Sequence, residues 1–231
     1  MATSKLSTLF QVFYEPKAAF TALKEKPAAW LPLALMMLGS LSVFYWYFST
    51  VDFAWLLDHT LSSQADLKPE AREAMAKFMT RDTMMYSTLG GVLIGTPLIF
   101  AVFALYYFIA SKVLGSNLGY GKWFHFTVWI SVPTLLGLPL MAVQVATGHG
   151  QISMEDLNML SLNYLTVHAP IGTPWASFLN NLSLPALWTM FVSFVGLRVW
   201  TERSTNACAF AAILPYAFFY GGWALKIVFS H

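Results

Sequence analysis

Five charged residues beside apolar runs are the side chains of this 231-residue sequence best placed to hold a ligand or partner. They are Lys24, Lys26, Arg198, Glu202 and Arg203. Arg198 and Glu202 are four residues apart, so on one helix they would share a face. Basic groups that end an apolar run either snorkel to water at a membrane surface or attract an anionic headgroup. We expect these residues to anchor a helix end or to contact a lipid headgroup or protein partner.

Side chains that could perform catalysis are scattered along the chain. The one cysteine, Cys208, excludes an intrachain disulfide, and no zinc-type Cys/His spacing exists. There is no H-E-x-x-H motif, Ser/Lys pair or buried carboxylate pair, and no Lys/Arg-rich block that would bind nucleic acid. We therefore predict no catalytic residue, no metal site, no cofactor and no nucleic-acid partner. The histidines are also far apart in the sequence: His59, His125, His149, His168 and His231.

Long segments without charge are the elements that must position these residues. Charged residues make up 10% of the chain, against roughly 25% in soluble domains. Five windows lack Asp, Glu, Lys and Arg and exceed the about 20 residues that cross a bilayer: 27–51, 83–111, 123–154, 157–197 and 204–225. We predict an all-α polytopic membrane protein with five transmembrane helices. The expected spans are 30–49, 85–109, 126–146, 184–200 and 207–228.

Residues 1–29 are predicted to form amphipathic helices ahead of a membrane bundle over 30–231. Apolar residues recur at helical spacing on both sides of Pro16: Leu6, Leu9, Phe10 and Phe13, then Phe20 and Leu23. Such helices either lie in the membrane interface, with lysines toward anionic headgroups, or dock on the end of the bundle. The sequence is compatible with both arrangements.

Two further segments are expected to lie outside the spans. Residues 157–181 are rich in Asn and interrupted by Pro and Gly, which makes them a poor lipid-facing span. We interpret them as short surface helices, one of which starts at Thr173-Pro174, a capping hydroxyl followed by proline. A separate helix is predicted over Pro69–Arg81.

Prolines and small residues mark places where the spans could bend or pack. Interior prolines remove a backbone hydrogen bond and kink a helix. The kinks either surround a central site, as in transporters, or reflect the higher frequency of proline in membrane helices. Small residues spaced by four serve packing within the chain or a dimer face. The predicted kinks are Pro97, Pro133, Pro139 and Pro215, and the predicted packing residues are Ser87, Gly91 and Gly95.

The distribution of Lys and Arg predicts the orientation in the membrane. Eight of the 13 basic residues fall on the side of the N-terminus and five on the other, where the 148–183 loop has none. Because cytoplasmic flanks carry more Lys and Arg, we expect a cytoplasmic N-terminus and an external C-terminus.

Three stretches of the sequence resemble bacterial members of the Yip family, the Ypt-interacting-protein-like or "Yip one" domain membrane proteins. The opening LFQVFYEPKAAFTALKEKPAAWLPLAL has the family's Pro–x3–Phe helix, second Pro and Trp at Pro16, Phe20, Pro27 and Trp30. KVLGSNLGYGKWFHFTVWISVPTLLGLPL is similar to its Gly-rich turn and Pro-containing span. LPALWTMFVSFVGLRVWTERSTNACAFAAILPYAFF is similar to its last two spans.

The resemblance implies a five-span bundle with a cytoplasmic N-terminus, in agreement with the charge distribution. Eukaryotic members of the family bind Rab GTPases, but this sequence lacks their long N-terminal region and acidic Tyr-Gly-Pro motif. We therefore expect no Rab-type partner. The expected function is that of a non-enzymatic inner-membrane organiser or adaptor that contacts the bilayer and a membrane or cytoplasmic protein. The alternative is a small transporter, channel or lipid-handling protein that uses the kinked helices.

Overall fold

The computed structural model describes residues 5–63 and 68–229 as α-helices joined by loops, with one isolated antiparallel bridge between Ser161 and Ser183. Among these residues, five helical stretches are long and apolar enough to cross a membrane. This confirms the prediction of an all-α polytopic membrane protein. The stretches are Trp30–Thr50, Arg81–Val113, Tyr120–Thr147, Leu184–Thr201 and Thr205–Phe229.

Each observed stretch contains the span expected from the sequence. The second and third extend furthest beyond it, because Arg81, Lys112 and Lys122 lie inside the helix ends. Helices can continue from the hydrocarbon into the headgroup region, where charged side chains reach water. Charge-free windows therefore do not mark where the second and third helical stretches begin, nor where the second one ends.

The chain divides into two compact units. Unit 1 contains the described residues of 1–36, 97–135 and 184–231. Its core is aromatic: Phe20, Tyr107, Trp123 and Phe126 are fully buried. Its elements are α1 (Lys5–Tyr14), α2 (Pro16–Glu25), the start of α3 (Trp30–Thr50), α7 (Thr96–Val113), α8 (Tyr120–Ile130), the 3-10 helix η2 (Val132–Leu136), α11 (Leu184–Thr201) and α12 (Thr205–Phe229).

Unit 2 contains the described residues of 37–96 and 136–183. Its smaller core gathers around Tyr47, Phe48 and Leu56, and Tyr47 donates a hydrogen bond to the Ile152 carbonyl at 2.9 Å. Its elements are the rest of α3, α4 (Phe53–Ser62), α5 (Pro69–Phe78), α6 (Arg81–Gly90), the π-helix η1 (Gly91–Gly95), α9 (Gly137–Thr147), the π-helix η3 (Asn163–Val167) and α10 (Pro174–Asn181).

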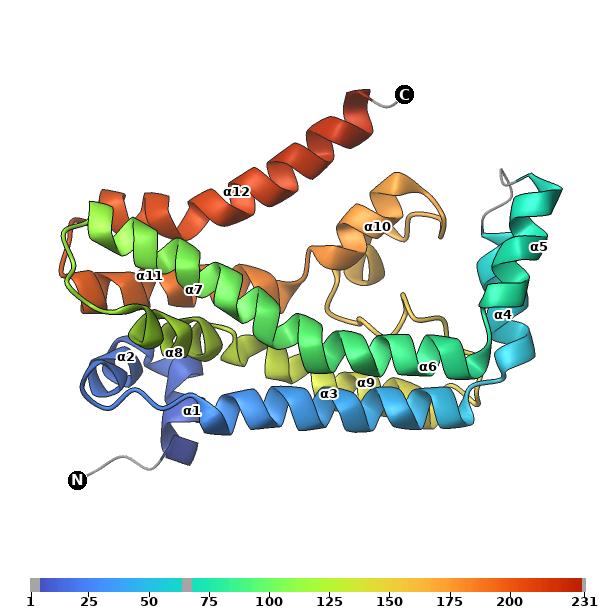
Figure 1. The fold of residues 1–231 in the computed structure, drawn as a ribbon, viewed down its shortest axis with the longest axis horizontal. Helices are drawn as coiled ribbons and strands as arrows, with labels where there is room; N and C mark the ends of the chain where they lie inside the picture. The colour runs from blue at the N-terminus through green and yellow to red at the C-terminus, as the bar shows by residue number, and fades with distance from the viewer. Residues whose placement is uncertain (1–4, 64–67, 230–231) are drawn as a thin grey trace. The chain divides into compact units, whose positions relative to one another are not determined.

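The N-terminal helices pack as part of unit 1 (Figure 1). Helix α2 lies on α11, and its apolar residues Phe20 and Leu23 are buried there. In α1, Leu9 is buried whereas Phe10 is 63% exposed. Of the two predicted arrangements, docking therefore describes α2, while α1 keeps one apolar edge exposed. The domain boundary at residue 29 stays a prediction.

Residues 157–181 form short helices, as predicted. Thr173 caps α10, because its hydroxyl accepts a hydrogen bond from the Ala176 N–H at 3.2 Å. Gly172 has φ +88°, and a Cβ at this position would meet the Ser63 carbonyl. Only glycine fits this turn, since it tolerates positive φ and has no Cβ.

The four prolines predicted as kinks lie in different local structures. Pro97 is the second residue of α7, the helix that directly follows η1, and Pro133 lies in η2 between α8 and α9. In both places the regular helix is interrupted next to a missing N–H, as expected where proline removes a backbone bond. Pro139 lies in the first turn of α9, where no helical bond is lost. Pro215 is inside α12, which changes direction along its length (Figure 1).

The predicted packing residues Ser87, Gly91 and Gly95 lie in α6 and η1. Ser87 and Gly91 are exposed, and a Cβ at Gly91 or Gly95 would meet no atom within 4 Å. No described segment therefore packs closely on the two glycines, and their use in packing stays a prediction.

Candidate functional site

The attachment of α2 to α11 forms the centre of the site. The Phe20 ring lies 5.5 Å from that of Phe126 and 6.4 Å from that of Trp200, between centroids. The Trp200 indole N–H donates to the Phe20 carbonyl at 2.9 Å. Gly196 makes room for this packing, because a Cβ there would lie 2.6 Å from Phe126 and 2.9 Å from Phe20. Helix α2 is thus fixed by a buried aromatic side chain and a buried hydrogen bond.

Lys24 ties the end of α2 to the end of α11. Its ammonium lies 2.5 Å from a Glu202 carboxylate oxygen and donates to the Val199 carbonyl at 3.1 Å. The last four carbonyls of a helix have no partner within it, and cations stabilise this negative end of the dipole. The hydrogen bond from Lys24 also lowers the pKa of the exposed Glu202 carboxyl. Lys24 and Glu202 therefore largely neutralise each other.

Arg198 and Glu202, four residues apart, line the same surface beside α2 but have different partners. Helix α11 ends at Thr201, and Glu202 has φ +56°, which turns it out of the helix toward Lys24. The Arg198 guanidinium instead donates to the Thr205 hydroxyl at 2.6 Å, across the turn to α12. The helix stops before Glu202, so the spacing of four places the two side chains on one surface without pairing them.

The other two predicted residues lie apart from each other. The Arg203 guanidinium reaches the Gly115 carbonyl at 3.5 Å and so touches the loop after α7. Lys26 is exposed just beyond the end of α2. The structure therefore brings Lys24, Arg198 and Glu202 to one place and leaves Lys26 and Arg203 at its edges.

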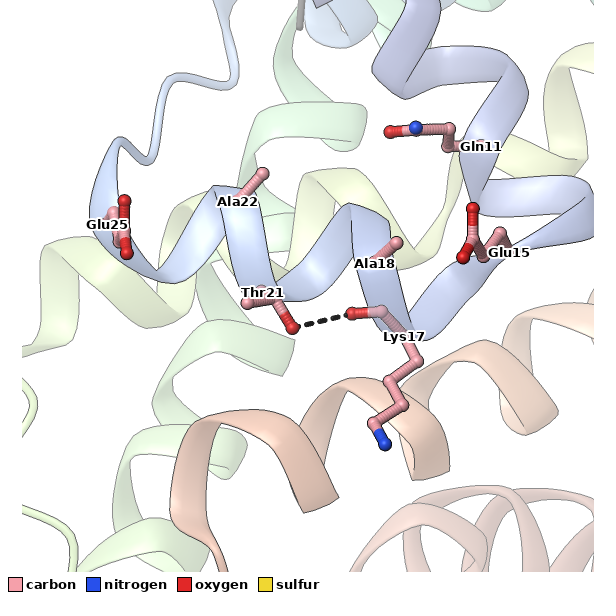
Figure 2. Close-up of a pocket in the computed structure, with 7 residues that line it drawn as sticks. All are labelled: Gln11, Glu15, Lys17, Ala18, Thr21, Ala22 and Glu25. Carbon is pink, nitrogen blue, oxygen red and sulfur yellow. Dashed lines mark hydrogen bonds between the residues drawn. The ribbon is translucent and has the colours of Figure 1, made fainter. Parts of the chain in front are cut away.

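Two hollows flank α2. The first, of about 450 Å³, is called the α2/α11 groove here. It is lined by Lys17, Thr21, Phe194, Val195, Arg198, Val199 and Glu202. The second, of about 480 Å³, is called the outer α2 pocket and is shown in Figure 2. It is lined by Gln11, Glu15, Lys17, Ala18, Thr21, Ala22 and Glu25.

The two hollows differ in charge. In Figure 2 the Lys17 side chain extends away from Gln11 and Glu15, toward the salmon-coloured ribbon. The outer α2 pocket keeps the carboxylates of Glu15 and Glu25, whereas the α2/α11 groove has Lys17 and Arg198. Helix α2 thus separates an acidic surface from a basic one.

Sequence reasoning missed Lys17 and Gly196 as members of the site. Both lie within the stretches that resemble the Yip family, but neither was singled out there. The pattern that could have found Gly196 is its position one turn before Trp200, which places both on one face of α11. No pattern in the sequence pairs that face with α2.

Unit 2 has a polar pocket of its own. It measures about 490 Å³ and is lined in part by Glu155, Asp156, Tyr164 and His168. The Gln144 amide donates to the Asp156 carbonyl and to the Tyr164 hydroxyl, both at 3.2 Å. Within residues 5–63 and 68–229, no three His, Cys, Asp or Glu side chains gather as metal ligands would.

Comparison with known proteins assigns the chain to a protein family. A model of the Yip1 domain matches residues 10–225 of the chain. A membrane protein of Bacillus subtilis (strain 168) named YknW is 27% identical over 222 residues, which cover 93% of this chain and 87% of that protein. No solved structure matches the chain. The match extends from α1 through most of α12 and so includes the α2/α11 attachment.

Proposed function

Because this chain belongs to the Yip1 domain family, we propose that it is a non-enzymatic adaptor or organiser of the bacterial inner membrane. Its cytoplasmic end holds a protein partner, and the outer α2 pocket is the contact surface. The observation that carries this proposal is that α2 is fixed on α11 by Phe20 and Trp200 while its outer face stays open. A preformed surface binds with less loss of conformational entropy than a flexible one.

The surface has the character of a protein contact. Glu15 and Glu25 stand at its two ends, and Ala18 and Ala22 form a flat apolar strip between them (Figure 2). A partner with two basic side chains around a small apolar patch would match this pattern, because complementary charges give specificity and faster association. The basic bias of the flanks supports a cytoplasmic location for this end.

Site-specific photo-crosslinking in cells tests the proposal. A photoreactive residue at Ala22, in the outer α2 pocket, is expected to give a discrete protein adduct. The matched control is the same residue at Leu98, an exposed apolar position of α7. The Ala22 adduct is expected to disappear in a Glu15→Lys, Glu25→Lys variant that melts like the parent. No adduct at Ala22, or the same adducts at Leu98, would contradict the proposal.

The second candidate is a small transporter or channel, and the polar pocket of unit 2 is the observation that favours it. The interrupted helices at η1 and η2 fit the same idea, because broken helices line the binding sites of transporters. Ion and solute flux across liposomes containing the purified protein would support it. Flux that equals that of empty liposomes would exclude it for the solutes tried.

A further inference from the structure

The α2/α11 groove has positive charge that no neighbouring carboxylate cancels. Glu202 is the one carboxylate among the described residues lining it, and that carboxylate is paired with Lys24. The hydrogen-bond partner of Arg198 is the neutral hydroxyl of Thr205. Lys17 has no ion pair within the parts of the chain that the structure describes. Two cations from two helices therefore face one groove.

The rest of the groove is apolar. Phe194, Val195 and Val199 of α11 form its wall and are only partly buried. Arg198 lies three residues before the end of α11, a candidate membrane span. With a rise of about 1.5 Å per residue, it is about 5 Å from the helix end, and Phe194 is one turn deeper. A span that leaves the bilayer at its last turn holds such a basic part at headgroup depth and the apolar part at the depth of the acyl chains.

The charge of the groove is local. The whole chain carries a net charge of only +2, and the carboxylates of Glu15 and Glu25 lie in the pocket on the other face of α2. Arg binds phosphate with a planar pair of donors and Lys binds it as a point charge. A ligand with a phosphate next to an apolar chain matches a groove that has two cations at one end and an apolar wall beside them.

We propose that the α2/α11 groove holds one anionic phospholipid. Its phosphate lies between Lys17 and Arg198, and the upper part of one acyl chain lies along Phe194 and Val195. The groove, at about 450 Å³, has the size of a ligand site. The protein partner proposed above uses the other face of α2, and Lys17 and Thr21 line both hollows.

The test is native mass spectrometry of the purified full-length protein titrated with phosphatidylglycerol or phosphatidylcholine. Phosphatidylglycerol is expected to bind at least about tenfold more tightly. The double variant Lys17→Gln, Arg198→Gln should lose about tenfold or more, since each cation near an anionic lipid contributes to its binding. The matched control, Lys77→Gln with Lys112→Gln, removes two exposed charges outside the groove and should change affinity less than twofold.

A second variant separates the apolar wall from the charge. Val195→Trp fills the groove and keeps both cations, so it should also weaken phosphatidylglycerol binding. Melting temperatures of all variants show whether they fold. The comparison of the two lipids on the unchanged protein needs no variant and decides the proposal even if a variant fails to fold.

Four results would overturn the proposal. The first is equal binding of the two lipids, and the second is equal loss in the groove and control variants. The third is displacement of the lipid by glycerol phosphate at a similar concentration, which would indicate a site for free anions. The fourth is phosphatidylglycerol binding that neither groove variant weakens, which would place the lipid outside the groove. Loss of the Ala22 adduct alone bears on the proposed function and leaves the lipid site standing.

Discussion

Helices α2 and α5 are alike in sequence and different in environment. Both have ten residues, both begin with proline, and both carry charges of each sign. Helix α2 buries Ala19, Phe20 and Leu23, whereas α5 buries no residue at all. An amphipathic sequence therefore does not by itself decide whether a helix docks.

The difference lies in the surface that each helix meets. Helix α2 finds Gly196 and Trp200 on α11, which leave a space for one ring and offer a donor for one carbonyl. The large apolar residue of α5, Phe78, is 78% exposed. A buried ring excludes water over its whole surface, whereas an exposed ring gains almost nothing. Docking requires both the projecting side chain and the cavity that receives it.

The largest expected contrast is in access from the two sides of the membrane. One span, Trp30–Thr50, separates α2 from α5. In intact cells we expect an impermeant maleimide to label Lys77→Cys fully and Lys26→Cys not at all. Both should react after permeabilisation, and the native Cys208 is buried and serves as the unreactive background. Labelling of Lys26→Cys in intact cells would overturn the predicted orientation.

Removal of a ring should have unequal effects in the two helices. Phe20→Ala is expected to lower the free energy of unfolding by about 3–5 kcal/mol, because it leaves a cavity next to Phe126 and Trp200. Phe78→Ala should change it by less than about 0.5 kcal/mol. Denaturant melts in detergent measure both. Similar values for the two variants would mean that α2 is not docked as described.

Filling the space that receives Phe20 should have a smaller effect. The Cβ of Gly196→Ala would press on the rings of Phe126 and Phe20, and such overpacking costs about 1–3 kcal/mol. Gly95→Ala in unit 2, where a Cβ meets no atom within 4 Å, should remain within about 1 kcal/mol of the parent. The same melts apply. A large loss at Gly95 would instead show that the Ser87–Gly91–Gly95 face packs on a second molecule.

The ion pair that links α2 to α11 should have the smallest effect, and that effect depends on pH. The folded protein has a lowered Glu202 pKa, so the pair stabilises the fold above the ordinary carboxyl value of 4.5. Its contribution is lost as pH falls through the lowered pKa. Glu202→Gln should melt slightly below the parent at neutral pH and together with it in acid. A difference for Glu202→Gln that persists in acid would contradict the assignment. Lys24→Gln also loses the bond to the Val199 carbonyl and should melt slightly below the parent at both pH values.

Local features of the fold could be predicted from the sequence. Charge-free windows located all five spans, and Thr173-Pro174 located the start of α10. Both depend on the solvent preference or backbone geometry of residues close together in the chain. The charged site was predicted only in part. Lys24, Arg198 and Glu202 were identified as candidates, but the salt bridge between Lys24 and Glu202 was not, because it joins two helices that are far apart in the sequence.

What the sequence by itself determined is that this chain is a helical membrane protein of the Yip1 domain type, with basic residues concentrated toward one side. What only the tertiary structure decided is which of those residues meet. Lys24 pairs with Glu202, and Phe20 fits beside Gly196, across more than 170 positions of sequence. The physical reason is that hydropathy is a property of each segment alone. The groove between α2 and α11 exists only when these two separate helices pack against each other. Its net charge is positive because Glu202, the carboxylate in its lining, is paired with Lys24.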